Sequence, residues 1–443
     1  MRRRDFLKTL TSGTAGATLL GPPAARACAG AQELAKPFRL SRHGCGRATG
    51  YAETNKIVTL AGKTHVTWLD SEGKGFYVRV RTLDHAGGAW SETYTVGEAH
   101  DNHGGPALTV DGQGFLHVVY YPHHHPFRYR RSVRPNDASA WGEEAQFGTR
   151  CTYPTLVCGQ DDTLYLTCRE SDRQPWVVNL YTKRPDGPWQ GPTAVLQAEQ
   201  QGYSHYQEAL SWGPDHRTLH LSCRIYDGKP GRPRVVGYLR SPDFGKTWQR
   251  SDGTPVELPA TARTVTAIAQ GSEPGGESLR CGSIAVDPSG KPHVLFSAST
   301  APDPISAWIA SPDDSGTWRR RPVLDELAGP LAGRRLTMAG GLTIAPDGRM
   351  FVVLQALQAP PGSDTWGHAS NEIVWLESLD GGRTFTARLA STPDADRAHW
   401  LPSIERPTGH NRVTVPGVIY TAGPPGERNT DTLANEVYWV GVK

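Results

Sequence analysis

The 443-residue sequence lacks several features that mark common protein classes. It has no long apolar run of helical periodicity, which argues against a helical bundle. The apolar stretch near the N-terminus, residues 10–20, is too short to remain as a membrane span. Neither charge is in excess, because 47 Lys and Arg residues balance 44 Asp and Glu residues and leave a net charge of +3. That balance excludes a nucleic-acid binder that works by bulk positive charge.

Cysteine is also sparse, and its seven positions do not form a tight disulfide framework. An odd number of widely spaced cysteines is more typical of buried free thiols in strands. Cys151 paired with Cys158 or Cys168 is the alternative that an oxidising compartment would permit. The seven are Cys28, Cys45, Cys151, Cys158, Cys168, Cys223 and Cys281.

Glycine and proline, by contrast, are abundant at 49 and 35 residues, and there are 13 Trp and 15 Tyr residues. This composition is typical of many short strands and turns. A hydrophobic content of 37% is enough to bury a core in a chain of this length, and the aromatic content argues against disorder.

The first residues have the pattern of an export signal. Arg2, Arg3 and Arg4 precede the short apolar stretch, and Ala25-Arg26-Ala27 offers a small-residue cleavage site. Paired arginines in this position predict a twin-arginine signal peptide over residues 1–27, with an ordinary secretory signal as the alternative. We therefore expect a bacterial protein exported in folded form, periplasmic or secreted. Residues 28–443 show no linker or break in composition, and we expect a single domain there.

The rest of the chain repeats a unit of two apolar strands joined by a turn rich in Asp, Gly and Pro. A second hairpin with a polar turn and an aromatic residue follows most copies. Seven pairs of hairpins predict an all-β fold, a seven-bladed β-propeller of four-stranded antiparallel blades. The copies begin at residues 56–58, 107–109, 155–157, 209–211, 283–285, 341–343 and 402–404.

Two of the second hairpins, residues 241–248 and 378–385, have the form Ser-x-Asp-x-Gly-x-Thr-aromatic, the Asp-box of sialidase-type propellers. We interpret the Asp-box as a turn-stabilising motif without chemistry. The last repeat is incomplete, because residues 435–439 resemble the third strand of the sixth unit and the sequence ends soon afterwards. We expect the missing outer strand to come from residues 37–42, which would close the ring.

Polar residues that the repeat does not require gather where strands of the second, third and fourth units begin or end. His103 lies in Asp101-Asn102-His103-Gly104-Gly105, and three histidines, His123, His124 and His125, follow the next strand pair. Starts of first strands and ends of second strands are adjacent in a blade, so one wall could hold all of these side chains. The others are Tyr153, Arg169, Tyr206 and Arg224.

Histidine, tyrosine and arginine together suit proton abstraction beside a carboxylate. Arginine pairs bidentately with a uronate and offsets the charge that develops as C5 is deprotonated. His or Tyr takes the proton, and a second such group protonates the leaving oxygen on C4. The set shows no carboxylate pair of the glycosidase kind and no nucleophile elbow or phosphate loop. The residue types therefore indicate β-elimination of a uronic-acid polysaccharide.

The segments 101–108 and 122–130, with Tyr153-Pro154 and Arg169, resemble the seven-bladed propeller ulvan lyases of the BNR-4 group (polysaccharide lyase families 24 and 25). The resemblance implies an active site of His103, one of His123 and His124, Tyr153 and Arg169. It implies substrate contacts at Asn102, Tyr206 and Arg224. The implied partner is an acidic polysaccharide such as ulvan, with no nucleic acid.

Two alternatives and one cofactor question stay open at this stage. The same fold group contains L-rhamnosyl-glucuronate hydrolases that use a histidine near the N-terminus, and His43 could be its counterpart. A non-catalytic glycan-binding propeller is the other alternative. β-Elimination requires no cofactor. If relatives hold a structural metal, His220 and Cys223 are candidate ligands, but the sequence does not identify a metal.

Overall fold

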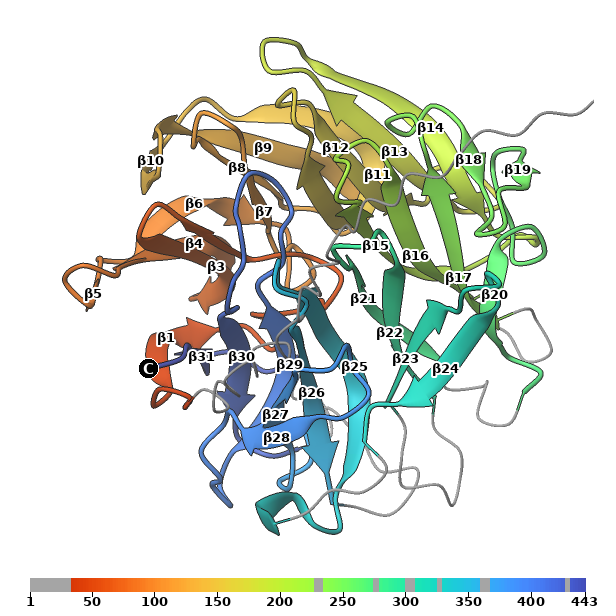
Figure 1. The fold of residues 1–443 in the computed structure, drawn as a ribbon. Helices are drawn as coiled ribbons and strands as arrows, with labels where there is room; N and C mark the ends of the chain where they lie inside the picture. The colour runs from red at the N-terminus through yellow and green to blue at the C-terminus, as the bar shows by residue number, and fades with distance from the viewer. Residues whose placement is uncertain are drawn as a thin grey trace, which may run out of the picture. The chain divides into compact units, whose positions relative to one another are not determined.

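Antiparallel β-strands form almost all of the regular structure of the chain (Figure 1). One 3-10 turn, η2 (Gly329–Leu331), is the helical element within the described residues, so none of their helices could cross a membrane. Residues from Glu33 to Lys443 group into one compact unit. The predicted signal peptide, residues 1–27, lies outside the described part. The computed structural model describes residues 33–226, 234–273, 279–298, 307–324, 329–358, 367–426 and 431–443.

The first sheet joins the two ends of the unit. β1 pairs antiparallel with β31, with Phe38 opposite Trp439, and it also pairs with β3 at Gly44. The N-terminal segment expected to complete the last repeat therefore does pair with its final strand. The nine strands of this sheet are β1 (Phe38–Gly44), β2 (Ile57–Leu60), β3 (Lys63–Glu72), β4 (Gly75–Asp84), β5 (Ala89–Trp90), β6 (Tyr94–Ala99), β29 (Ala398–Ile404), β30 (Val418–Gly423) and β31 (Asn435–Val440).

The second sheet contains a strand longer than the repeat predicts. β11 runs without a break from Ala145 to Cys158, pairing first with β9 and then, from Cys151 onwards, with β12. It thus serves as an outer strand of one repeat and the first strand of the next. The eight strands are β7 (Ala107–Val110), β8 (Leu116–Tyr120), β9 (His125–Arg134), β10 (Asp137–Trp141), β11 (Ala145–Cys158), β12 (Leu164–Glu170), β13 (Val177–Lys183) and β14 (Trp189–Gln197).

Three further sheets contain six, four and four strands. The third comprises β15 (His205–Trp212), β16 (Leu219–Tyr226), β17 (Arg234–Ser241), β18 (Trp248–Gln249), β19 (Pro255–Val256) and β20 (Thr266–Gln270). The fourth comprises β21 (Arg280–Val286), β22 (Pro292–Ser297), β23 (Ala307–Pro312) and β24 (Trp318–Pro322). The fifth comprises β25 (Arg335–Ile344), β26 (Met350–Leu357), β27 (Glu372–Ser378) and β28 (Thr386–Leu389).

The first strands of the repeats contact one another in chain order. Each of them packs against the first strand of the next repeat, from β2 as far as β29. A hydrogen bond connects the last repeat to the first, because Oε1 of Glu405, just after β29, accepts the backbone N–H of Thr59 in β2 at 2.5 Å. The contacting pairs are β2 with β7, β7 with β11, β11 with β15, β15 with β21, β21 with β25, and β25 with β29.

The core lies between neighbouring groups of strands. Val157 and Val178 from the second sheet pack in one cluster with Leu210 and Leu221 from the third, and all four are almost fully buried. Each such side chain contributes roughly 1.5–3 kcal/mol when buried. Apolar side chains on alternate strand positions therefore hold successive groups together and fix which strand ends come close to each other.

The two Asp-box segments form the same turn. In residues 241–248 the Asp243 carboxylate accepts the N–H of Thr247 at 2.8 Å, and the Ser241 hydroxyl accepts the N–H of Gly245. Asp380 and Ser378 do the same for Thr384 and Gly382 in residues 378–385. These side chains satisfy the backbone of a tight hairpin.

Candidate active site

The Asp101–Gly105 segment lies against the chain that follows β8. The N–H of His100 donates to the carbonyl of Tyr121 at 2.9 Å, and the N–H of Tyr121 donates to the carbonyl of Gly104. A Cβ at Gly104 would lie 2.7 Å from both the Tyr121 carbonyl oxygen and the Ala99 Cβ, so only glycine allows this approach. The two histidine-bearing segments are thereby held side by side.

Asp101 lies between the two histidines that the segments bring together. Its Oδ1 lies 3.2 Å from Nδ1 of His103 and also accepts the His103 backbone N–H at 2.7 Å. Its Oδ2 lies 2.6 Å from Nδ1 of His123. The two imidazole rings stack with centroids 3.9 Å apart. One carboxylate therefore orients both rings through their Nδ1 atoms.

Protonation follows from these contacts. Desolvation acts to raise the pKa of Asp101, but the hydrogen bonds from His103 and His123 hold that pKa well below its usual range. Burial lowers the pKa of His103 below its ordinary value, and Asp101 offsets part of this effect. A neutral His103 that donates Nδ1–H to Asp101 presents Nε2 as a proton acceptor.

His124 lies in a different environment from His123. Its Nδ1 is 2.5 Å from the Ser171 hydroxyl, and its Nε2 is 3.4 Å from a guanidinium nitrogen of Arg169. Burial, and then the charge of Arg169, lowers the pKa of His124 to about 4. The sequence left His123 and His124 as alternatives. The structure places His123 with Asp101 and His103, and His124 with Arg169.

Arg169 is buried, with 1% of its surface exposed, and is enclosed by aromatic rings. Its guanidinium carbon lies 4.7 Å from the Tyr153 ring centroid and 5.1 Å from that of Trp176. Its Nε has no hydrogen-bond partner, and no carboxylate of the described residues lies within ion-pair distance of it. The buried Glu208 carboxyl group acts electrostatically on Arg169, but burial raises the pKa of Glu208 well above its ordinary value and favours its neutral form. A desolvated cation whose interacting carboxyl group is neutral is suited to bind an anion.

Tyr153 links this group to a cavity of about 190 Å³. Its ring contacts that of Tyr51 edge-on at 4.8 Å and lies 6.4 Å from the ring of His103. Burial raises the pKa of Tyr153 above its ordinary value, although Arg169 acts in the opposite direction. Tyr153 is therefore a phenol, able to donate a proton, at neutral pH.

The cavity beside Tyr153 is rich in arginine. Arg224 lines it, donating to the carbonyl of Leu279 at 2.9 Å and contacting Nδ1 of His205. Burial, and then the charge of Arg280, lowers the pKa of Arg224 to about 9. Other lining side chains that the sequence did not single out are Arg47, Tyr51, Glu53, His205, Gln207, Tyr226 and Arg280.

Tyr206 does not reach the site. It is fully buried in an apolar cluster, and its hydroxyl donates to the backbone carbonyl of Trp176 at 2.6 Å. His205, one residue earlier in β15, faces the cavity instead. Successive residues of a strand point to opposite faces, so His205 lines the site while the predicted Tyr206 points away from it. Asn102 lies in the turn between Asp101 and His103 and is half-buried.

The structure does not bring the side chains of His220 and Cys223 together. They are three residues apart in β16 and so project from opposite faces of that strand. Nδ1 of His220 lies 2.7 Å from the Tyr238 hydroxyl. The six cysteines of the described part are all buried free thiols, as predicted; Cys28 lies outside that part.

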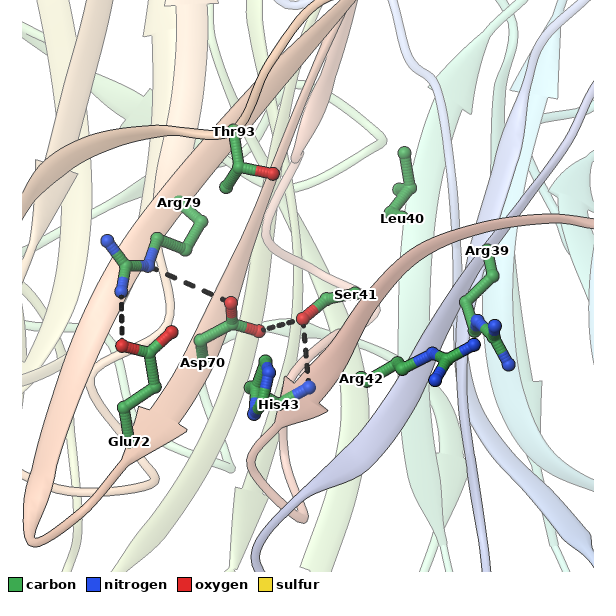
Figure 2. A pocket seen from close by; sticks show the side chains of 9 residues that line it. All are labelled: Arg39, Leu40, Ser41, Arg42, His43, Asp70, Glu72, Arg79 and Thr93. Carbon is green, nitrogen blue, oxygen red and sulfur yellow. Dashed lines mark hydrogen bonds and ion pairs between the residues drawn. The ribbon is translucent and has the colours of Figure 1, made fainter.

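His43 lines a second pocket, of about 520 Å³, which Figure 2 shows. Two carboxylates lie there on either side of Arg79: Asp70 at 3.7 Å from its Nε and Glu72 at 3.0 Å from a terminal nitrogen. Asp70 also accepts a hydrogen bond from Ser41 at 2.8 Å. Burial raises the pKa of Asp70, although the hydrogen bonds from Ser41 and Trp68 lower it in part. None of the catalytic residues predicted for a lyase lines this pocket.

The fold and the site together define an all-β protein of antiparallel sheets. It brings a carboxylate-oriented histidine pair close to a tyrosine and to an arginine that forms no ion pair within the described residues. Residues 63–326, more than half of the chain, match the BNR repeat-containing family. The chain belongs to that family.

The chain is also similar to characterised relatives. It is 21% identical over 278 residues to the ulvan lyase PL25 of Pseudoalteromonas sp. (strain PLSV), an alignment that covers 53% of this chain and 56% of the relative. The chain thus matches little more than half the length of that relative. A solved structure of a PL25 ulvan lyase superposes with a TM-score of 0.69 at 16% identity, over 91% of this chain and 95% of the other. The polysaccharide lyase Uly1 superposes with a TM-score of 0.60 at 12% identity, over 93% and 99%.

Proposed function

We propose that the protein is a polysaccharide lyase that cleaves a uronic-acid-containing, ulvan-like polysaccharide by β-elimination. The observation that carries the proposal is the buried guanidinium of Arg169, which forms no ion pair with a carboxylate of the described residues and lies beside Tyr153 and His124. The similarity to PL25 ulvan lyases, one of them solved with a GlcA(1-4)Rha3S chain bound, supports this substrate class.

In the proposed reaction Arg169 pairs with the uronate carboxylate and stabilises the negative charge that forms as C5 loses its proton. Nε2 of His103 takes this proton, because Nδ1 is directed at Asp101. The electron pair forms the C4–C5 double bond, and the C4–O4 bond breaks. Tyr153 gives its phenolic proton to the leaving O4, since burial keeps the phenol protonated. No cofactor takes part in these steps.

The remaining predicted residues would position the catalytic groups or contact the substrate. His123 shares Asp101 with His103 and stacks on it, so it holds the base in place. His124 contacts both Ser171 and Arg169 and would orient the guanidinium. Arg224 and Asn102 would contact the polymer beside the cleavage point. We withdraw Tyr206 from this set because its ring packs in an apolar cluster and its hydroxyl donates to the Trp176 carbonyl.

We also propose that residues 33–443 form a seven-bladed β-propeller closed by β1. The succession of contacts from β2 to β29, the hydrogen bond of Glu405 to Thr59 and the β1–β31 pairing support this arrangement. The arginine pair and cleavage motif within residues 1–27 support export through the twin-arginine route to the periplasm or beyond.

The test is ultraviolet absorbance of the unsaturated uronate, measured while purified protein acts on a panel of uronate polysaccharides that includes ulvan. We expect rising absorbance with ulvan-like polymers and none with Arg169→Ala or Tyr153→Phe. The control is Arg319→Ala, since Arg319 is exposed and pairs only with Asp313 among the described residues. Full lyase activity of Arg169→Ala would rule out this mechanism.

A hydrolase of the same uronate–rhamnose linkage is the second candidate. The pocket that His43 shares with Asp70 and Glu72 favours it, because hydrolysis needs a proton donor and a group that activates water (Figure 2). New reducing ends without ultraviolet absorbance, lost in His43→Ala and kept in Arg169→Ala, would establish the hydrolase. Binding of the polymer with unchanged chain length would instead identify a non-catalytic glycan-binding protein.

A further inference from the structure

The connection between β29 and β30 is not a short turn. Residues 405–412 run along the first strands of other repeats: the N–H of Cys158 in β11 donates to the carbonyl of Thr408 at 2.7 Å, and the N–H of His410 donates to the carbonyl of Val110 in β7 at 3.1 Å. Figure 1 shows this connection in blue beside β7. We call residues 405–412 the crossing loop.

At the tip of the crossing loop, His410 meets two metal-ligating groups from the end of β11 and the turn after it. Its Nε2 lies 3.1 Å from Oδ1 of Asp162. The thiol of Cys158, the Asp162 carboxylate and the His410 imidazole each place a ligand atom within 4.8 Å of the other two. Cys158 is buried, while Asp162 and His410 keep side-chain exposures of 18% and 30%, so solvent and ions reach the cluster from one side.

These three ligands fit one ion. Zinc binds thiolate sulfur at about 2.3 Å and imidazole or carboxylate at about 2.0–2.2 Å, so ligand atoms of one site lie up to about 4.5 Å apart. Small side-chain rotations would bring the three atoms to such distances. The Gly159 carbonyl oxygen, 3.1 Å from Nε2 of His410 and 3.6 Å from the Cys158 sulfur, or a water molecule would complete the coordination.

The surrounding charge also favours a cation. Asp111 and Asp161 act electrostatically on the Cys158 thiol in addition to Asp162. His117 and Arg131 contact Asp111 at 3.1 and 3.3 Å, whereas no Lys or Arg of the described residues forms an ion pair with Asp161 or Asp162. His216 interacts electrostatically with His410, and Lys183 with His117. Among these ion-pair contacts of the described residues, Arg131 is the one basic group that is charged without protonation of a histidine, against three carboxylates.

We propose that Cys158, Asp162 and His410 bind a divalent transition-metal ion of the zinc class, which fastens the crossing loop to the turn after β11. Mixed sulfur, nitrogen and oxygen ligands select zinc or cobalt over magnesium or calcium. The site is structural, and it does not depend on the proposed lyase reaction, because none of its ligands belongs to the Asp101–His103–Arg169 group.

The test uses full-length protein without a histidine tag, stripped with a chelator and then titrated with Zn²⁺ or Co²⁺. Elemental analysis should give about one equivalent per chain, and Co²⁺ should produce a thiolate-to-cobalt charge-transfer band. Cys158→Ser should abolish the band, and His410→Gln should weaken binding. Cys281→Ser, a buried thiol outside the cluster, should keep both the band and the stoichiometry.

Thermal unfolding provides a second readout. Saturating Zn²⁺ should raise the unfolding midpoint of the wild type by about 4 °C, and should leave that of His410→Gln unchanged. If Cys158→Ser fails to fold, the partly exposed His410 still allows the test. Wild-type protein that binds much less than one equivalent would overturn the proposal. So would cobalt bound without a thiolate band, since that result would assign the ion to the Asp101–His103–His123 group.

Discussion

The guanidinium of Arg169 packs against the ring of Tyr153, although regular strand geometry would separate them. Arg169 in β12 is opposite Thr152 in β11, so Tyr153 would normally point to the other face. The register shifts between Thr152 and Thr155, and Tyr153 has a φ of 60°. Such a bulge redirects a side chain at an energetic cost, which is typical of functional sites.

Replacing Arg169 with lysine tests whether planar pairing with a carboxylate matters. A lysine keeps the charge but loses the forked donors and the stacking on Tyr153 and Trp176. We expect kcat/KM for the polysaccharide to fall by about 10²-fold or more. Initial rates of ultraviolet absorbance measure this. Activity of Arg169→Lys equal to that of Arg319→Ala would contradict the assigned role.

Asp101→Asn tests the orientation of the histidine pair. Asparagine preserves the shape, but it is uncharged and replaces one of the two acceptor oxygens with an NH₂ donor. It therefore cannot accept Nδ1–H from both His103 and His123, and the tautomer of His103 changes. We expect kcat to decrease by about 10²-fold with a much smaller change in KM. Unchanged kcat would show that Asp101 does not orient the base. Asp137→Asn, an exchange at a partly exposed surface aspartate, provides the matched control.

The pH profile of the reaction follows from two shifted groups. His103 must be neutral to accept a proton, and its pKa lies below the ordinary value of about 6.5, so activity should decline only below that pH. Tyr153 must be protonated, and its pKa lies above the ordinary value of about 10, so the alkaline decline should begin above that pH. Measurement of kcat/KM from pH 5 to 11 checks both limbs. If the residual activity of Tyr153→Phe shows the same alkaline decline, that decline belongs to a group other than Tyr153.

Stability should also depend on pH through buried neutral histidines. Burial lowers the pKa of His65 and of His220 to about 4, whereas both titrate near 6.5 in the unfolded chain. Between pH 4 and pH 6.5 the unfolded chain therefore binds more protons than the folded chain. The free energy of unfolding is thus highest above pH 6.5 and falls as the pH decreases toward 4. Urea unfolding at several pH values measures this. His220→Gln should flatten the dependence, and an equally steep dependence in that variant would exclude His220 as a source.

Gly104→Ala tests the close approach of the two histidine segments. The new methyl group would meet the Tyr121 carbonyl oxygen and the Ala99 Cβ at 2.7 Å. We expect a loss of roughly 1–3 kcal/mol in the free energy of unfolding and reduced activity, because the Asp101–His103 contact moves. Gly87→Ala, where nothing lies within 4 Å of an added Cβ, should leave both unchanged. A fully stable and active Gly104→Ala variant would exclude the steric argument.

The sequence predicted the all-β class and the segments of the site, because period-two patterns and turn residues are local signals. It could not choose between His123 and His124, since that choice depends on a φ of 62° at His124 and on contacts with Asp101 and Ser171. The sequence also listed Tyr206 as a substrate contact, whereas in the structure His205 lines the cavity and Tyr206 lies in an apolar cluster. One position of strand register decides which of these two neighbours faces the cavity.

Other features depend on contacts between distant parts of the chain. The segment that begins Glu405-Arg406-Pro407-Thr408 has no apolar periodicity that would place it against β7 and β11. Asp101 belongs to the segment 101–108 of the sequence, but its contacts with the imidazoles of both His103 and His123 depend on the folded structure. Tyr51 and Arg47 belong to no motif in the sequence. They are candidate site residues only because they line the same cavity as Tyr153.

The pairing of β1 with β31 has a consequence for biosynthesis. Arg39 and Glu436 form an ion pair although they are 397 positions apart in the sequence, so the sheet cannot be completed until almost the whole chain has left the ribosome. Until then β1 has no β31 to pair with and β30 keeps an open edge, which invites association with other chains. Because the two ends finish on neighbouring strands, a circular permutant opened at an exposed turn and joined there could be translated with both partners already adjacent.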